Sequence, residues 1–447
     1  MGRTGIAMQY ANKIADIINA FQSKPLAIEE LDAFYYSDTM PVRTGNRDAS
    51  PILDISEACK TPSDSNVFLL LGHRGCGKST ELNHMSKHLQ EDGYPVRTID
   101  CAADLDLNSP VFEDLLILMG DALLSIADDC GCELDPALQK FLETYWNEVE
   151  RDWTAIGSGT LETGVKVEAK TPKLLRVLTL SSAMKGILKY NEQRRTIYRQ
   201  HISKRLSEWT WATKQIADAI SEKLDGKQPI IIFEDLDKLE SNEAWEVFFD
   251  HARTLSDFSF PVIYTFPIAL SYDARFHALE GFFQARTFPM IKVQKLEGGR
   301  NEAGFDAIRA LLRKRADLDA LFEDGVVDRM IEKTGGSLRN LFDVIKDAAR
   351  LTRRRNSTRI GMEATDYALV SLQSVLTRRI EKKHYGFLAE IALGNREEIK
   401  DKEMLLEMLQ GGIVLEYNGK RWHNVHPLVE DFLRDQKRLP AKQNDDA

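Results

Sequence analysis

One turn of eight residues constrains the fold of this chain more than any other part of its sequence. The turn begins at Gly72 and reads Gly-His-Arg-Gly-Cys-Gly-Lys-Ser, which fits G-x-x-x-x-G-K-[ST] at every fixed position. An apolar run over 67–71 precedes it, and Leu82, Met85 and Leu89 mark one face of a helix after it. A strand, a glycine-rich turn and a helix in this order predict a loop whose backbone N–H groups surround phosphate oxygens. The alternative is an ordinary glycine-rich turn, and both flanking elements argue against it.

The residue types in the turn suit separate roles at a phosphate site. Glycines let the backbone approach the ligand closely, and we expect Lys78 to contact the β- and γ-phosphates. We expect the Ser79 hydroxyl to bind Mg²⁺. The predicted cofactors are therefore ATP and Mg²⁺. The predicted ligand contacts are Gly72, Gly75, Cys76, Gly77, Lys78, Ser79 and Thr80.

A second apolar run ends in acidic residues. Residues 230–233 are Ile-Ile-Ile-Phe, and Glu234, Asp235 and Asp237 follow them. Ligands of open α/β sheets bind at the carboxyl ends of the strands, so we expect these acids beside the phosphates. Glu234 or Asp235 would complete the metal site with Ser79. Asp235 or Asp237 would orient the attacking water, and spacing alone does not decide between them.

The remaining pattern predicts an α/β fold. Short apolar runs alternate with helical segments, which is typical of parallel strands joined by crossover helices. Several runs are continuous, as expected for strands covered on both faces. We interpret 134–198 as a mostly helical insertion with an extended piece at 164–168. The predicted parallel five-stranded sheet comprises 67–71, 94–99, 229–233, 261–266 and 288–293.

After residue 296 the pattern becomes helical, and then it changes once more. Two short helices are followed by two strand-like runs with Asn418-Gly419 between them, a strong hairpin signal. Helix, helix and hairpin predict a winged helix. The lid helices are predicted at 302–316, 325–333, 337–351 and 363–383. The predicted domains are an N-terminal helical segment and linker (1–50), a P-loop α/β core (51–296), a helical lid (297–384), a winged helix (385–436) and a disordered tail (437–447).

Composition limits the classes of partner. The formal charge of -10 argues against a protein that coats DNA, and no run is long and apolar enough to cross a bilayer. The five cysteines form no paired ligand pattern, which is typical of a reducing compartment. We therefore expect a cytoplasmic protein without a membrane partner.

The stretch 346–385 departs from this acidic balance. It holds ten Lys or Arg residues and four acids. This stretch is either a surface that faces nucleic acid or phosphate, or the solvated face of helices.

Four segments carry a resemblance to known proteins. With both phosphate-site motifs placed, the chain resembles the AAA+ and STAND-type ATPases, in the branch with a C-terminal winged helix like the replication-origin loaders. Residues 234–238 also resemble the DDLDR-type motif of bacterial conflict and antiphage defence ATPases. The segments are GHRGCGKSTEL (72–82), IIIFEDLDKL (230–239), VIYTFP (262–267) and GGSLRNL (335–341).

The resemblance implies an AAA+-like ATPase and further site residues. Thr265 would detect the γ-phosphate from a sensor strand, and Arg339 would reach the phosphates from the lid. Arg286 or Arg275 would act as an arginine finger in a neighbouring subunit's site. Glu234 stands where relatives usually have Asp, which leaves the strength of Mg²⁺ binding open. The loop at 42–47 would lie near the adenine.

Three functional hypotheses follow. The first is an ATP-hydrolysing switch that regulates a protein effector encoded elsewhere in antiphage or conflict defence, as a homo-oligomer or hetero-complex. The second is a DNA-associated loader or transposition-type regulator that acts through the winged helix and the stretch 346–385. The third is a nucleotide-bound scaffold that never turns over. The short predicted wing carries two cations, Lys420 and Arg421, so we favour docking to protein over base readout.

Overall fold

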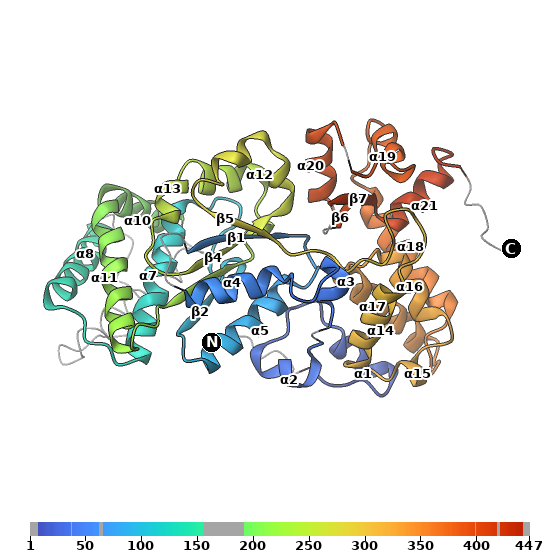
Figure 1. Cartoon of the computed structure of the whole chain (residues 1–447), viewed down its shortest axis with the longest axis horizontal. Helices are drawn as coiled ribbons and strands as arrows, with labels where there is room; N and C mark the ends of the chain where they lie inside the picture. Colours follow the sequence, from blue (N-terminus) through green and yellow to red (C-terminus); the bar gives the residue numbers. More distant parts are fainter. Residues whose placement is uncertain are drawn as a thin grey trace.

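The computed structural model describes residues 8–36, 38–61, 66–155, 192–397, 399–417 and 421–440. A five-stranded parallel sheet lies between outer helices at one end and a large helical region at the other (Figure 1). The strand order is β2-β3-β4-β1-β5, which confirms the predicted α/β architecture. The strands are β1 (Val67–Gly72), β2 (Val96–Asp100), β3 (Ile230–Glu234), β4 (Val262–Pro267) and β5 (Gln284–Thr287).

Strand β1, which lies between β4 and the edge strand β5, separates two apolar cores. Its six residues are all buried, because β4 and β5 flank it and helices cover both faces of the sheet. Leu69 and Leu71 face one core, whereas Phe68 and Leu70 face the other, as the two-residue period of a strand requires. The first core contains α7 (Phe112–Asp129) and α11 (Leu206–Lys223), and the second contains α4 (Pro51–Lys60) and α5 (Lys78–Glu91).

The fifth strand was predicted in the wrong place. Residues 288–293 were expected to form it, but β5 is Gln284–Thr287, and Thr287 pairs with Leu71. Phe288 makes one more backbone contact with Leu71 O (2.8 Å), and the chain then leaves the sheet. The run is apolar because Phe288, Met290 and Ile291 are buried between the core and the lid. Strand β5 is polar because it lies at the edge of the sheet, where its four residues are only half-buried.

The insertion is helical where it is described. Its helices α8 (Pro136–Ala155) and α10 (Glu192–Lys204) pack beside α11 at the outer end of the sheet (Figure 1). Arg199 forms an ion pair of 2.6 Å with Asp114 of α7, whose side chain is buried. The extended piece predicted at 164–168 lies outside the described residues.

The N-terminal segment packs against both the core and the lid. Ile14 and Ile17 belong to the apolar core that the lid helices form. The loop expected at 42–47 begins inside a helix, Met40–Thr44, which contains the buried residue Arg43. The segment comprises α1 (Ile14–Ala20), η1 (Ile28–Glu30), α2 (Leu31–Phe34) and α3 (Met40–Thr44).

The lid and the C-terminal region share one apolar core. The lid helices are α14 (Glu302–Arg313), α15 (Leu318–Leu321), α16 (Val326–Thr334), α17 (Leu338–Arg354) and α18 (Met362–Thr377). The C-terminal module, residues 384–440, comprises α19 (His384–Ala392), α20 (Lys402–Gln410), the antiparallel strands β6 (Val414–Tyr417) and β7 (Trp422–Val425), and α21 (Pro427–Asp435). The predicted Asn418-Gly419 turn and residues 441–447 lie outside the described chain. Leu439 is buried, so the expected disordered tail does not begin at 437.

Short elements complete the described chain. Among the described helices, none is both long and apolar enough to cross a membrane. The short elements are α6 (Cys101–Asp104), η2 (Leu236–Lys238), α12 (Ser241–Ala244), η3 (Trp245–Phe249), α13 (Ala252–Ser256), η4 (Ile268–Tyr272) and η5 (Ala274–Ala278).

Candidate nucleotide site

The glycine-rich turn joins β1 to α5, as the sequence predicts. Gly75 (φ +81°) and Gly77 (φ +108°) have left-handed backbone conformations that favour glycine. Helix α5 begins at Lys78, so its first backbone N–H groups face the turn. This geometry suits an anion at the helix N-terminus.

Lys78 is held by the turn and by one acid. Its Nζ donates to Gly72 O (2.6 Å) and His73 O (3.0 Å), and it lies 2.8 Å from Asp237 Oδ2. Burial opposes the charge on this side chain, but Asp237 holds the pKa of Lys78 above its ordinary value. The ammonium group is therefore charged and buried, with three oxygen partners that phosphate oxygens can replace.

Glu234, the last residue of β3, lies behind the turn and contacts the Ser79 hydroxyl. Burial, followed by the nearby Asp235 and Asp237, raises the pKa of Glu234 to about 8. Its Oε1 atom is buried and has no hydrogen-bond partner among the described residues. A buried carboxylate oxygen without a partner, next to a serine hydroxyl, fits the oxygen ligands that Mg²⁺ prefers.

The other two acids differ in their partners. Asp235 has a left-handed backbone (φ +69°) and forms an ion pair of 2.7 Å with Lys238. Non-glycine residues such as Asp235 are uncommon in the left-handed conformation, and they occur most often at functional sites. Asp237 forms its ion pair with Lys78 instead. Both side chains line the cavity described below.

Thr265, on β4, lies between the turn and the acidic strand but has a structural task. Its hydroxyl accepts from Leu236 N (3.1 Å) and donates to Phe233 O (3.2 Å). The side chain is buried and fixes the direction of the chain after β3. Thr265 is not one of the described residues that line the cavity introduced below.

The structure separates the three arginines singled out by the sequence. Arg339, the second residue of the lid helix α17, lies against the turn: its N donates to Gly75 O (3.3 Å), and its side chain lines the cavity. Arg286 is a residue of β5 and bonds Ala285 O (3.0 Å). Arg275 pairs with Asp273 and stacks on Trp245. Arg286 and Arg275 are not brought to the cavity within the described chain.

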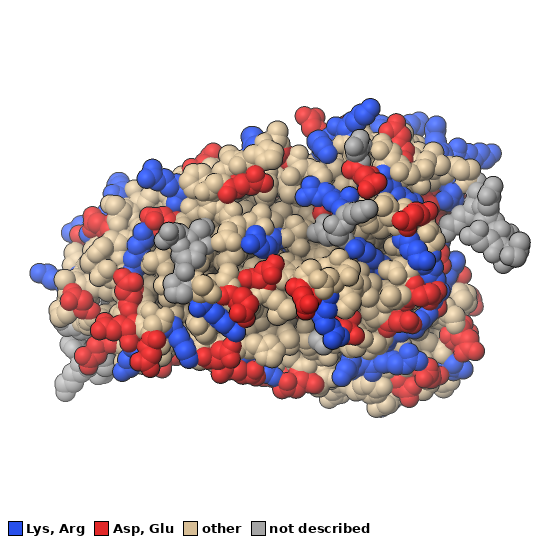
Figure 2. Space-filling view, in the orientation of Figure 1, with Lys and Arg blue, Asp and Glu red and all other residues tan. Residues whose placement is uncertain are grey.

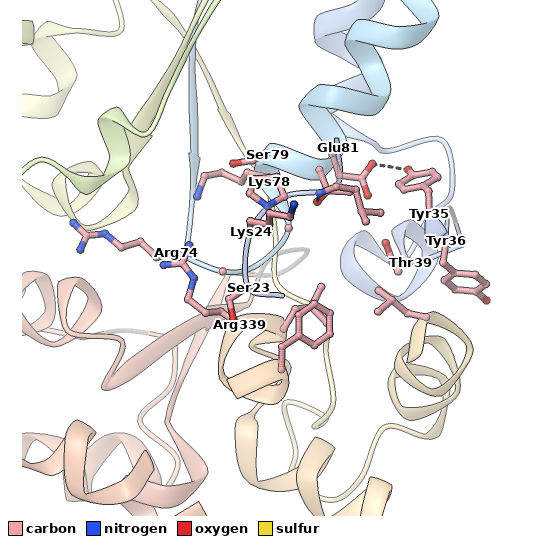
Figure 3. Close-up of a pocket in the computed structure, with 18 of the residues that line it drawn as sticks. Ser23, Lys24, Tyr35, Tyr36, Thr39, Arg74, Lys78, Ser79, Glu81 and Arg339 are labelled. Atoms are coloured by element: carbon pink, nitrogen blue, oxygen red, sulfur yellow. Dashed lines mark hydrogen bonds between the residues drawn. The ribbon is translucent and has the colours of Figure 1, made fainter. Parts of the chain in front are cut away.

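A cavity lies beside the turn, and three parts of the chain form its walls. The core contributes the turn and the start of α5, the lid contributes Leu311, Arg315, Leu338 and Phe342, and the N-terminal segment contributes 23–43. Figure 3 shows Tyr35, Tyr36 and Thr39 on one side of Lys78, and Arg74 and Arg339 on the other. An apolar, aromatic side opposite a cationic side suits a nucleotide, with its base and its phosphates at opposite ends.

The N-terminal wall was largely missed from sequence, although the loop at 42–47 was expected nearby. Tyr35 OH donates to Glu81 Oε2 of α5 (2.8 Å), and Leu26 N donates to Thr80 Oγ1 (3.3 Å). On the lid side, Ser23 Oγ donates to Asp343 Oδ1 (2.7 Å). The segment therefore bridges α5 and α17 across the cavity.

Arg43 supports the turn from outside. Its Nη2 donates to Cys76 O (2.9 Å), its Nε donates to Thr39 Oγ1 (3.1 Å), and its guanidinium lies 4.6 Å from the centre of the Phe288 ring. Burial lowers the pKa of Arg43. No motif in the sequence marks Arg43, which falls in the loop expected at 42–47.

His73 connects the turn to the C-terminal module. Its Nε2 accepts from the backbone N of Glu416 in β6 (2.8 Å). Burial, then Lys78 and His423, lower the pKa of His73 to about 3, so the ring is neutral. Beside it, Tyr417 OH donates to Gly335 O (2.6 Å), at the start of the lid helix that carries Arg339.

The basic stretch 346–385 is neutralised in part. Lys346, Arg350 and Arg355 pair with Asp343, Asp347 and Glu363, respectively. Figure 2 shows positive and negative side chains intermixed over the lid. This arrangement favours the solvated helical face over a continuous phosphate-facing surface.

Comparison with known proteins finds distant structural similarity only. No family model matches the chain, and no curated protein matches it. The Walker-type ATPase of Pyrococcus abyssi is 14% identical with a TM-score of 0.45, over 93% of this chain and 99% of that one. The Aeropyrum pernix ORC2 protein is 12% identical with a TM-score of 0.37, over 94% and 98%. The Thermotoga maritima RuvB Holliday junction branch migration motor is 9% identical with a TM-score of 0.34, over 89% and 99%. Such values are too low to assign a function to this chain.

Proposed function

We propose that this protein is an AAA+-like ATPase in which ATP binding and hydrolysis change the contacts among core, lid and C-terminal module. The observation that carries this proposal is Lys78. It is charged and buried at a helix N-terminus, and its partners are Gly72 O, His73 O and Asp237. A triphosphate can replace all three partners, because it offers more charge to the same ammonium group.

The roles of the acids follow from their partners. Glu234 contacts Ser79, so these two residues would hold Mg²⁺. A bound Mg²⁺ would neutralise charge on the β- and γ-phosphates. Asp237 faces Lys78, which leaves Asp235 as the carboxylate that orients the attacking water. Asp235 as an additional metal ligand remains the alternative.

The switch would act through two contacts of the turn. Arg339 approaches the turn from the lid and would contact the γ-phosphate. His73 is bonded to the C-terminal module. A phosphate that draws Lys78 away from His73 O therefore changes the segment to which the module is attached, which makes the module a two-state element.

We infer that the C-terminal module is a winged helix that docks a protein partner. The order of helices and hairpin supports this, and the resemblance of 234–238 to defence ATPases suggests an effector encoded elsewhere. The ion pairs of Lys346, Arg350 and Arg355 reduce the free positive charge of 346–385, which weakens the alternative of DNA binding. If DNA at low salt shifts the electrophoretic mobility of the protein or accelerates its ATP hydrolysis, the DNA-associated function is favoured over protein docking. Size-exclusion chromatography with and without a non-hydrolysable ATP analogue tests the predicted oligomer.

Two variants test the chemistry. Lys78→Ala should abolish ATP binding, measured by equilibrium binding of a labelled nucleotide. Asp235→Asn should retain binding and lose turnover. If wild-type protein binds ATP with Mg²⁺ but never releases phosphate, the chain is a nucleotide-bound scaffold and the hydrolytic proposal is wrong.

A further inference from the structure

A second cavity adjoins the nucleotide cavity. Arg74, Asp237 and Arg339 line both cavities, so these three side chains form the partition between them. The second cavity continues between the lid and the C-terminal module, where it is lined by Leu376, Arg379, Leu409, Gln410, Gly411 and Leu415. It thus begins where a γ-phosphate would lie and ends at the proposed mobile module.

The charge of this cavity favours an anion. Asp237 is the only acid among the described residues that line it, and Lys78 already neutralises that acid at 2.8 Å. Arg74 and Arg339 lie on the partition, and the exposed Arg379 lies two residues after the end of α18. Ion pairs are found for neither Arg339 nor Arg379 within the described chain. Guanidinium groups bind phosphate through paired hydrogen bonds, so this set suits a tetrahedral oxyanion.

We propose that the second cavity receives inorganic phosphate after hydrolysis and that Arg379 binds it there. This proposal rests on the proposed ATPase function. In hydrolysis, the water oxygen bonds to the γ-phosphorus, the bond from that phosphorus to the β–γ bridging oxygen breaks, and ADP and inorganic phosphate result. ADP still fills the first cavity, so phosphate leaves past Arg74 and Arg339 toward Arg379. Phosphate bound there would lie against the C-terminal module.

Two neighbouring arginines provide the test. Arg379 lines the cavity, whereas Arg378, which is also exposed, lines neither cavity. Inorganic phosphate is titrated into full-length protein saturated with ADP and Mg²⁺. We expect Arg379→Ala to weaken phosphate binding about tenfold or more, since a hydrogen bond to a charged group contributes roughly 1.5–3 kcal/mol. Arg378→Ala should bind like wild type. Equal phosphate affinity of the two variants overturns the proposal.

A kinetic measurement separates this inference from the proposed function. Cleavage of ATP in a single turnover is compared with the appearance of free phosphate, reported by a fluorescent phosphate-binding protein. Arg379→Ala should change the delay between the two events and leave ATP affinity and the cleavage rate unchanged. An unchanged delay contradicts the exit route. If wild-type protein does not cleave ATP, the proposed function fails, and the phosphate titration still decides whether the cavity is an anion site.

Discussion

Acid should release the C-terminal module from the rest of the protein. Three buried histidines lie at its contacts: His73 accepts from Glu416 N, His423 contacts Tyr272 OH, and His426 contacts Asn340. Burial, the largest cause in each case, lowers the pKa of His73 and His426 to about 3 and that of His423 to about 4.

The sign and size of the effect follow from these values. A histidine freed into water has a pKa of about 6.5, so the released state binds protons that the docked state excludes. Docking stability is therefore complete above pH 6.5 and falls as the pH decreases toward the pKa values of the docked state. At pH 5, which is about 1.5 units below the pKa of a free histidine, each histidine that stays neutral in the docked state reduces the docking stability by about 2 kcal/mol.

The variant His73→Phe isolates one of the three contributions. It leaves Glu416 N–H buried without an acceptor, which should cost about 1–3 kcal/mol at pH 7. At pH 5 the wild-type ring carries its own protonation cost of about 2 kcal/mol, and the variant has no such cost. The stability difference between wild type and variant should therefore shrink by about 2 kcal/mol on going from pH 7 to pH 5.

Hydrogen exchange of the β6 and β7 amides, corrected for the intrinsic pH dependence of exchange, measures the opening free energy directly. Tyr417→Phe is the matched control, because it removes a buried hydrogen bond to Gly335 O from the same strand without removing a group that titrates in this range. The opening free energy of Tyr417→Phe should be lower than that of wild type by the same amount at both pH values. If the deficit of His73→Phe is also the same at pH 7 and pH 5, the neutral buried His73 does not contribute to docking as argued.

Three further substitutions test the surroundings of the turn. Gly75→Ala should reduce ATP affinity by more than tenfold, because its Cβ would lie 2.4 Å from Arg339 Cβ and φ is +81°; near-wild-type affinity in a binding titration would contradict this. Arg43→Met should lower the free energy of unfolding by about 3 kcal/mol, since it leaves the buried Cys76 O without its partner; equilibrium denaturation measures this. Arg339→Ala should lower the affinity for ATP more than that for ADP. An equal loss of affinity for both nucleotides would contradict the proposed contact between Arg339 and the γ-phosphate.

The sequence was sufficient to predict those parts of the site that are built from contiguous residues. The turn, its flanking strand and helix, and the acids after β3 all follow from patterns within a dozen residues. Hydrophobicity failed at 288–293, because burial between core and lid produces the same apolar run as pairing in a sheet. The order of the strands, which places β4 with Thr265 between β1 and β3, comes from contacts far apart in sequence.

Long-range contacts also explain the residues that were missed. Tyr35 reaches Glu81, and Arg43 reaches Cys76, from a polar N-terminal stretch with no motif of its own. His73 occupies a variable position of the turn pattern, so its bond to Glu416, 343 residues away in sequence, leaves no trace in local spacing. Side chains at variable positions of a phosphate loop can only be interpreted once their partners are known.

The glycine-rich turn forms hydrogen bonds with the N-terminal segment, the lid and the C-terminal module. Arg43 holds it at Cys76 O from the N-terminal segment, Arg339 N contacts Gly75 O from the lid, and His73 accepts from the C-terminal module. Lys78 bonds Gly72 O and His73 O from inside. If phosphate binds as proposed and draws Lys78 away, Gly72 O and His73 O lose a charged donor, and a buried polar group without a partner costs about 1–3 kcal/mol. We would then expect the turn to shift and β6 to respond first outside the core, because His73, which would lose the contact with Lys78, also accepts from Glu416 N.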